Sequence, residues 1–248
     1  LCTCCGCTNE SVGRHADMSF NTEEFWHHGF CKIRENIPRS IIDAHRGFLN
    51  SSQIQIDRGH DVHGNYYNKP PKRKIQWANT WSQELSETQI VNACNKFYMP
   101  QIALLLDDPV LYHSDVVTTY PNFQTVRPHI DTPYRHESFA DEDQFLGVQC
   151  LLPLTEDFGP RTGGTAFVPG SHNTKWNIKD CYNGKHDEYF TQNCVATQVN
   201  YGEMLIWHPR VLHSATPNHG VEKRPALLML YVERHIHDEL RVIENIIS

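Results

Sequence analysis

No apolar stretch in this sequence reaches the roughly 18 residues that a membrane-spanning helix needs, and no charged-then-apolar signal segment opens it. Positive charge is also scarce, because 22 lysines and arginines stand against 29 aspartates and glutamates, which gives a formal net charge of −7. Nucleic-acid-binding proteins usually carry a basic surface. The one compact basic run, Lys72-Arg73-Lys74, follows Pro70-Pro71 and is interpreted as a solvated loop. We expect a soluble, cytoplasmic protein without a nucleic-acid or membrane partner.

A disulfide framework is missing as well. The cysteine count is nine, an odd number, and five of these residues are scattered through segments of different character: Cys31, Cys94, Cys150, Cys181 and Cys194. In a chain of 248 residues this pattern indicates reduced thiols in an intracellular compartment.

The remaining cysteines lie at the N-terminus, where Cys2, Cys4, Cys5 and Cys7 form two overlapping C-x-x-C spacings. Such spacings occur in zinc sites. The segment nevertheless lacks hydrophobic periodicity, and Met18 precedes the first helical pattern. We expect residues 1–17 to be a flexible leader or a non-native extension.

The rest of the chain, 18–248, has a length and a 39% hydrophobic content that fit a single domain. No internal repeat is evident. Its first part, about 18–108, is predicted to be helical. Capping patterns at Asn21 and Ser86 and apolar spacing over about 39–49 each indicate a helix, and Pro100 is expected to kink or end the third.

From about residue 109 the pattern changes to short β-branched and aromatic runs bounded by glycine and proline. These runs cover 116–120, 145–154, 165–168, 204–207 and 225–232. Five strands without intervening helices predict an antiparallel sandwich or barrel over about 109–233, with the helical part packed outside it and a C-terminal helical tail at 234–248.

Four residues carry the strongest chemical signal: His129 and Asp131 in an H-x-D pattern, then His213, then Arg224. Two imidazoles and one carboxylate leave coordination positions open on a non-haem iron, and a guanidinium can hold a carboxylate through two parallel hydrogen bonds. A second H-x-D, formed by His113 and Asp115, competes with the first. We interpret it as a pair flanking the turn before a strand.

The motifs around the four residues resemble the phytanoyl-CoA dioxygenase family of iron(II)- and 2-oxoglutarate-dependent oxygenases. They are RPHIDTP at 127–133, GGTAFVPGSH at 163–172, GEMLIWHPRVLHS at 202–214 and RP at 224–225, and the opening FWHHGF at 25–30 is similar too. The resemblance extends from about residue 19 to about residue 233.

This resemblance implies a double-stranded β-helix, that is, a cupin-like jelly roll with flanking helices. In it His129, Asp131 and His213 bind Fe(II), and Arg224 pairs with the distal carboxylate of 2-oxoglutarate. O2 is the oxidant and ascorbate a candidate reductant. Because Asp131 retains the carboxylate that related halogenases replace with a small residue, hydroxylation of an unactivated C–H is expected, with release of succinate and carbon dioxide.

Further contacts to 2-oxoglutarate are expected from Tyr120 and Gln149, if their strands turn them inward. Many relatives have a serine two residues beyond the distal histidine. Here that position is Ala215, so Thr216 or another hydroxyl is the candidate substitute.

Two alternatives remain open. A cupin-type zinc or manganese enzyme would use the same triad without needing Arg224, and a binding module without activity would share only the fold. The expected partner is a small polar or carboxylate-bearing molecule, which Arg127, Arg161 or Arg210 would meet. Long polar segments at 54–81 and 134–144 are the expected lids. The sequence does not indicate an oligomeric state.

Overall fold

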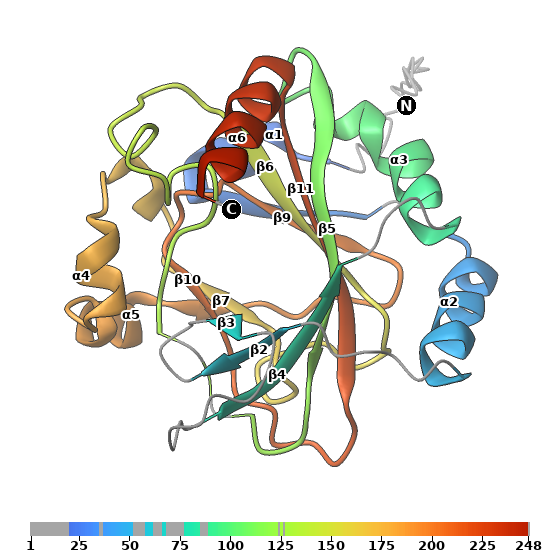
Figure 1. Cartoon of the computed structure of the whole chain (residues 1–248). Coiled ribbons are helices and arrows are strands. Elements are labelled where there is room, and N and C mark those ends of the chain that lie inside the picture. The colour runs from blue at the N-terminus through green and yellow to red at the C-terminus, as the bar shows by residue number, and fades with distance from the viewer. Residues whose placement is uncertain are drawn as a thin grey trace, which may run out of the picture.

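The two sheets and six α-helices of this protein are seen in a computed structural model, which describes residues 20–34, 37–51, 58–61, 66–67, 77–84, 89–123, 125 and 127–247 (Figure 1). The helices are α1 (Thr22–His28), α2 (Arg39–Ser51), α3 (Gln89–Ile102), the 3-10 helix η1 (Ser171–Asn173), α4 (Ile178–Tyr182), α5 (Asp187–Asn193) and α6 (Arg234–Ile247). The strands are β1 (Phe30–Ile33), β2 (Arg58–Asp61), β3 (Tyr66–Tyr67), β4 (Trp77–Glu84), β5 (Pro109–Thr119), β6 (Gly147–Pro153), β7 (Thr165–Phe167), β8 (Val195–Ala196), β9 (Met204–Trp207), β10 (His213–Ala215) and β11 (Arg224–Glu233). The predictions for 1–17, for Lys72–Lys74 and for the cap at Ser86 lie outside the described residues.

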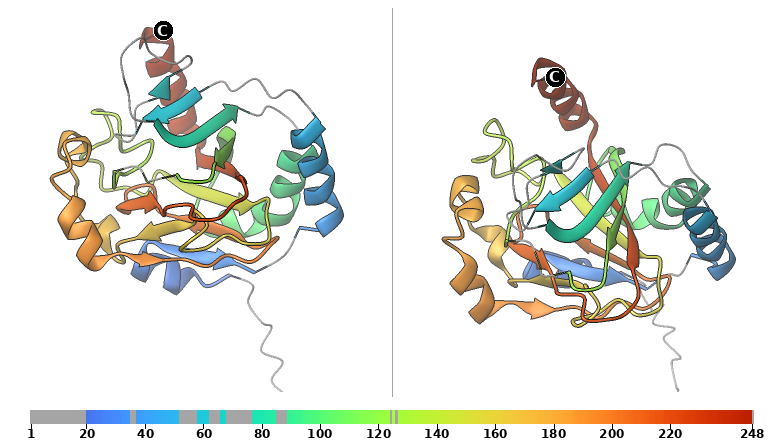
Figure 2. Two further views of the ribbon diagram at one scale, coloured as in Figure 1. Left: turned by 90° about the horizontal axis from the view of Figure 1, so that it is seen from below. Right: turned by 60° about the horizontal axis from the view of Figure 1, so that its bottom comes forward.

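Every strand pair is antiparallel. The larger sheet has the order β1-β9-β6-β11-β5-β4-β2-β3, and the smaller has the order β10-β7-β8. Helices α2 and α3 lie on one flank of the sheets, and α4 and α5 lie on the opposite flank (Figures 1 and 2). This arrangement is the predicted mainly-β, jelly-roll architecture.

The region 18–108 departs from the prediction. It holds three helices, but it also supplies β1, β2, β3 and β4 to the larger sheet. The strand signal was weak because β4 reads WANTWSQE, with few apolar residues. The described parts of 54–81 are therefore largely strands paired next to β5 and not an irregular lid.

Local sequence signals explain the ends of α1 and the end of α3. The side chain of Asn21 accepts hydrogen bonds from the backbone N–H groups of Glu23 and Glu24 at 3.0 and 3.1 Å, which fixes the start of α1. Gly29, at φ +83°, ends that helix in the left-handed conformation. Pro100 lies inside α3, and the helix ends two residues later at Ile102.

Strands β6 and β9 of the larger sheet are buried on both faces. Successive residues of a strand point to opposite faces, so Cys150 of β6 and Met229 of β11 pack in the hydrophobic cluster that includes α2 and α3 residues. Leu151 and Trp207 instead pack with Phe167 of the smaller sheet.

We call the side of the larger sheet that faces the smaller sheet the inner face. Strand register assigns to it the following residues: His113, Asp115, Val117 and Thr119 of β5; Arg224, Ala226, Leu228 and Leu230 of β11; Gln149 and Leu151 of β6; and Leu205 and Trp207 of β9.

Helix α6 and the segment 134–144, which has neither helix nor strand, pack together. Both pack in one hydrophobic cluster, to which Tyr134, Leu230 and Leu240 belong. The Tyr134 hydroxyl donates to the Gln144 carbonyl at 2.7 Å and accepts from the Leu146 N–H at 3.1 Å. The segment expected to be a lid is thus anchored at both ends.

Two other sequence predictions concern cysteines and membranes. Cys31, Cys94, Cys150, Cys181 and Cys194 carry free thiols in this structure. Among the described helices, none combines the length and the apolar character that crossing a bilayer requires.

Candidate metal centre

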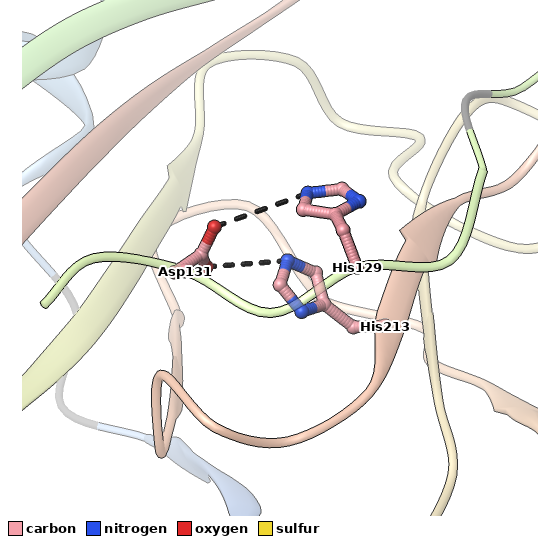
Figure 3. Close-up of side chains that lie close together, drawn as sticks. All are labelled: His129, Asp131 and His213. Atoms are coloured by element: carbon pink, nitrogen blue, oxygen red, sulfur yellow. Dashed lines mark ion pairs between the residues drawn. The ribbon is translucent and has the colours of Figure 1, made fainter. Parts of the chain in front are cut away.

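Two distant segments meet at the predicted metal ligands. The backbones of His129 and His213 form an isolated antiparallel bridge, with N–H···O distances of 2.9 and 3.0 Å. The N–H of Asp131 donates to the carbonyl of Pro209 at 2.7 Å. This backbone pairing brings the three side chains into one cluster, which Figure 3 shows.

The spacing within the cluster suits a metal ion. Nε2 of His213 lies 3.2 Å from Oδ2 of Asp131, and Nε2 of His129 lies 3.9 Å from Oδ1. One candidate ligand atom from each residue lies within 4.8 Å of the others. Ligands at about 2.0–2.2 Å from a shared ion would have such separations. Within the described part of the chain, no other histidine, cysteine or carboxylate group of three or more has this geometry.

Neighbouring groups orient all three side chains. Nδ1 of His129 lies 2.9 Å from the carbonyl of Arg127, and Nδ1 of His213 lies 3.0 Å from that of Val211. A carbonyl only accepts, so each Nδ1 carries the proton and each Nε2 presents a lone pair to the centre. The indole of Trp207 donates to Oδ2 of Asp131 at 3.0 Å, which fixes the carboxylate.

The protonation states of His129 and Asp131 agree with this role. Burial and the neighbouring His213 lower the pKa of His129 to about 3, so its ring is neutral near pH 7. Burial opposes ionisation of Asp131, but the two histidines and Arg135 hold its pKa below the ordinary value. Burial lowers the pKa of His213, whereas Asp131 raises it, and the net shift is upward. A neutral imidazole and a carboxylate anion are the forms that bind metals.

Arg224 begins β11 on the inner face and is only 6% exposed. Its guanidinium lies over the ring of Phe158 at 4.2 Å, and burial lowers its pKa to about 9. Nε and Nη1 are buried and have no hydrogen-bond partner among the described residues. An unpaired buried cation is costly, and a carboxylate ligand would supply the missing bonds.

Gly163 allows a close approach to this arginine. It has φ +77°, and a Cβ there would lie 2.9 Å from both Nε of Arg224 and Oγ1 of Thr119. The Gly163-Gly164 pair is therefore part of a turn that packs against the guanidinium.

The three supporting residues predicted from the sequence differ in their position relative to the site. Gln149 is 5% exposed and pairs with Trp207 in the strand register, so its side chain lies on the inner face. This is the orientation that a contact with 2-oxoglutarate would need. The Thr216 hydroxyl lies 3.3 Å from the carbonyl oxygens of Gly159 and Gly164, to which it can donate its proton. No described hydrogen bond joins it to Arg224. Tyr120 follows β5 at a turn, where its carbonyl accepts from Phe123 at 3.1 Å. No described hydrogen bond or ring contact joins its side chain to the triad.

Thr119 was missed by the sequence analysis. It is buried and pairs with Arg224 in the strand register. Its hydroxyl, like Nε of Arg224, points to the turn at Gly163. The β-branched run at 116–120 marked the strand, but no sequence signal shows that the strand pairs with residue 224.

The second H-x-D was interpreted wrongly. His113 and Asp115 lie within β5, which begins at Pro109, and do not flank a turn. The residues 109–115 are mixed in polarity, so the strand was predicted too short.

Comparison with known proteins bears on the fold and on the family. The family model "Phytanoyl-CoA dioxygenase (PhyH)" matches residues 25–226. No curated protein matches the sequence.

Three solved structures are similar. The alpha-ketoglutarate-dependent carbocyclase SnoK from nogalamycin biosynthesis is 17% identical, with a TM-score of 0.63 and coverage of 85% of this chain and 82% of SnoK. HygX from Streptomyces hygroscopicus, with nickel, 2-oxoglutarate and hygromycin B bound, is 13% identical, with a TM-score of 0.63 and coverage of 87% and 88%. The epimerase SnoN from nogalamycin biosynthesis is 15% identical, with a TM-score of 0.59 and coverage of 85% and 81%.

These low identities establish a shared fold, and the family rests on the sequence model. Because that model spans most of the sequence, this chain belongs to the phytanoyl-CoA dioxygenase family of 2-oxoglutarate-dependent non-haem iron enzymes.

Proposed function

We propose that this protein is an iron(II)- and 2-oxoglutarate-dependent dioxygenase that hydroxylates an unactivated C–H bond of a small organic molecule. One oxygen atom of O2 enters the new hydroxyl group and the other enters succinate, while 2-oxoglutarate loses carbon dioxide. The substrate C–H bond and the O–O bond break. O2 is reduced by four electrons, of which the substrate supplies two and the keto acid supplies two.

The observation that carries this proposal is the presence, on the same inner face, of three residues spaced for a metal ion and of a buried arginine. Two nitrogens of that arginine have no hydrogen-bond partner among the described residues. His129, Asp131 and His213 would hold Fe(II) through two Nε2 atoms and a carboxylate, which leaves positions for 2-oxoglutarate and O2. Arg224 would bind the distal carboxylate through Nε and Nη1, which have no hydrogen-bond partner among the described residues. A zinc or manganese enzyme without 2-oxoglutarate would leave this buried cation unexplained.

The reaction type is the finer part of the proposal. Asp131 supplies the carboxylate ligand, which favours hydroxylation over halogenation. The names of SnoK and SnoN, a carbocyclase and an epimerase, associate this fold with other outcomes. Labelling with ¹⁸O2 separates them, because hydroxylation places the label in the product, whereas cyclisation and epimerisation do not.

The substrate is proposed to be small and polar, in line with the antibiotic hygromycin B in the HygX structure. Two of the arginines considered for an anionic substrate are already engaged. Nε of Arg127 lies 3.9 Å from a carboxylate oxygen of Asp187, and Arg210 donates to the Glu142 carbonyl and covers the Tyr134 ring at 4.1 Å. This weakens the case for a carboxylate-bearing substrate at those positions.

The decisive experiment is anaerobic titration of the metal-free protein with Fe(II) and then with 2-oxoglutarate. A weak visible charge-transfer band should appear, should require Asp131, and should need far more 2-oxoglutarate in an Arg224→Met variant. A folded, iron-loaded protein that shows no band at saturating 2-oxoglutarate would refute the proposal. It would favour the cupin-type metal enzyme or, if iron did not bind either, the binding module.

A further inference from the structure

Thr119 lies beside Arg224 on the inner face, at the end of β5. The two residues are a cross-strand pair of β5 and β11, so their side chains point to the same face of the larger sheet. A Cβ at Gly163 would lie 2.9 Å from Oγ1 of Thr119, 2.9 Å from Nε of Arg224 and 3.0 Å from Nη2. The hydroxyl oxygen therefore lies within about 6 Å of each nitrogen, a gap that one carboxylate oxygen can bridge with two hydrogen bonds.

The surroundings of the guanidinium restrict how a carboxylate can bind. The ring of Phe158 covers one face of it at 4.2 Å, so a hydrogen-bonding ligand approaches in the plane of the guanidinium. A carboxylate has about four lone-pair sites, and a two-pronged contact with an arginine uses only part of them. Because Arg224 is 6% exposed and Thr119 is 2% exposed, water has little access to supply the remaining hydrogen bonds. A bound carboxylate therefore needs a further protein donor beside Arg224.

The Thr119 hydroxyl has only a long hydrogen bond of its own in the described structure. It donates to the carbonyl of Arg224 at 3.4 Å, beyond the usual O–H···O distance of about 2.5–3.0 Å. A hydroxyl proton rotates about its C–O bond, and a hydrogen bond to an ionised acceptor is about twice as strong as one to a neutral acceptor. A carboxylate oxygen near Oγ1 would therefore replace the carbonyl as the acceptor.

Two neighbouring hydroxyls form shorter hydrogen bonds. The Thr216 hydroxyl lies 3.3 Å from two backbone carbonyl oxygens, and the Ser214 hydroxyl lies 2.9 Å from that of Thr125. Ala215 stands where many relatives have a serine, and its side chain has no donor. Strand register, in contrast, places Thr119 directly beside the guanidinium.

We propose that Thr119 binds the distal carboxylate of 2-oxoglutarate together with Arg224, and so supplies the hydroxyl that this chain lacks at position 215. The inference rests on the proposed function and deepens it, because it assigns a second residue to the co-substrate. Its consequence is selectivity: the site should prefer a 2-oxo acid with a carboxylate at its far end over one that ends in a methyl group.

Thr119→Val tests this with little disturbance, because it removes the hydroxyl and keeps a β-branched side chain in the strand. Thr119→Ala is a second variant without the hydroxyl, and Thr119→Ser keeps the hydroxyl without the methyl group. The matched control is Thr118→Val, the same change one residue earlier in β5. Thr118 points to the opposite face of the strand, which it shares with Val116 of the hydrophobic cluster that includes α2 and α3 residues.

Two 2-oxo acids serve as probes. 2-Oxoglutarate carries the distal carboxylate, and 2-oxopentanoate has the same carbon chain with a methyl group in place of that carboxylate. The Kd of each acid is measured without turnover, from the anaerobic charge-transfer band with Fe(II) and from thermal unfolding with Mn(II). Fe(II) affinity is measured separately, in competition with a chelator.

We expect Thr119→Val and Thr119→Ala to raise the Kd for 2-oxoglutarate about 10- to 100-fold, as the loss of a hydrogen bond to a charged group implies. Thr119→Ser and Thr118→Val should keep it close to the wild-type value. Fe(II) affinity and the Kd for 2-oxopentanoate, which lacks the carboxylate, should not change in any of these variants.

Three results would overturn the inference: an unchanged Kd for 2-oxoglutarate in folded Thr119→Val, an equal rise in Thr118→Val or Thr119→Ser, or an equal rise for both acids. Loss of folding in both variants without the hydroxyl would also overturn it, since Thr119 would then be structural. Absence of the band in the wild type would instead refute the proposed function.

Discussion

Replacement of Arg224 by methionine isolates the charge in the candidate co-substrate site, because an unbranched apolar side chain remains and the guanidinium is lost. Removing one partner of a buried ion pair costs about 3–5 kcal/mol. At about 1.4 kcal/mol per factor of ten, the Kd for 2-oxoglutarate should rise about 100- to 4,000-fold.

The effect on stability without 2-oxoglutarate has the opposite sign. Burial lowers the pKa of Arg224 to about 9, so the folded protein bears a cost for its charged form. Two of its nitrogens have no partner in the described structure to offset that cost. We therefore expect the Tm of the Arg224→Met variant without 2-oxoglutarate to equal or exceed that of the wild type.

Thermal unfolding with Mn(II), with and without 2-oxoglutarate, measures both effects. At a concentration of 100 times the wild-type Kd, 2-oxoglutarate should stabilise the wild type by about 2.7 kcal/mol and the variant by about 0.4 kcal/mol or less. For a chain of this size these values correspond to shifts of about 5–11 °C and about 1 °C. The control is Arg234→Met, which removes an exposed guanidinium paired with Asp108 at 2.7 Å. A wild-type shift in the Arg224→Met variant would refute the assignment of Arg224.

Four further substitutions test the centre. Asp131→Ala should abolish Fe(II) binding measured by metal analysis after gel filtration, whereas Asp115→Ala should leave it intact; the reverse would move the metal to the second H-x-D. Trp207→Phe removes the hydrogen bond to Asp131 and should weaken Fe(II) about 10- to 100-fold in competition with a chelator, and an unchanged affinity would deny that bond a role. Gly163→Ala adds a Cβ at φ +77° against Arg224, which should cost about 1–3 kcal/mol in urea unfolding and weaken 2-oxoglutarate; normal values for both would show that the turn tolerates a side chain.

The sequence predicts those features that depend on nearby residues. Asn21 and Gly29 fix α1 by local hydrogen bonding and backbone conformation, and the β-branched runs mark β6, β7, β9 and β11. The triad and Arg224 are proposed as site residues because their motifs occur in the order typical of the family. Each of these signals lies within one short stretch of the chain.

Features that depend on pairing between distant segments were not predictable in this way. β4 is recognisable only from its register with β5, and Thr119 becomes relevant to the site only because β11 places Arg224 opposite it. The orientation of Gln149 likewise required the register with Trp207. The polarity of His113 and Asp115 suggested a turn, whereas both residues lie within β5 and Asp115 is buried.

The backbone bridge between His129 and His213 has a consequence for metal exchange. Its two hydrogen bonds, of 2.9 and 3.0 Å, space the ligands through the main chain, so the entropy of assembling the site is lost on folding and not on metal uptake. An ion that binds there meets a preorganised site and need not order the chain. Iron should thus be removable by chelation from a protein that stays folded, and other divalent ions should take its place without refolding.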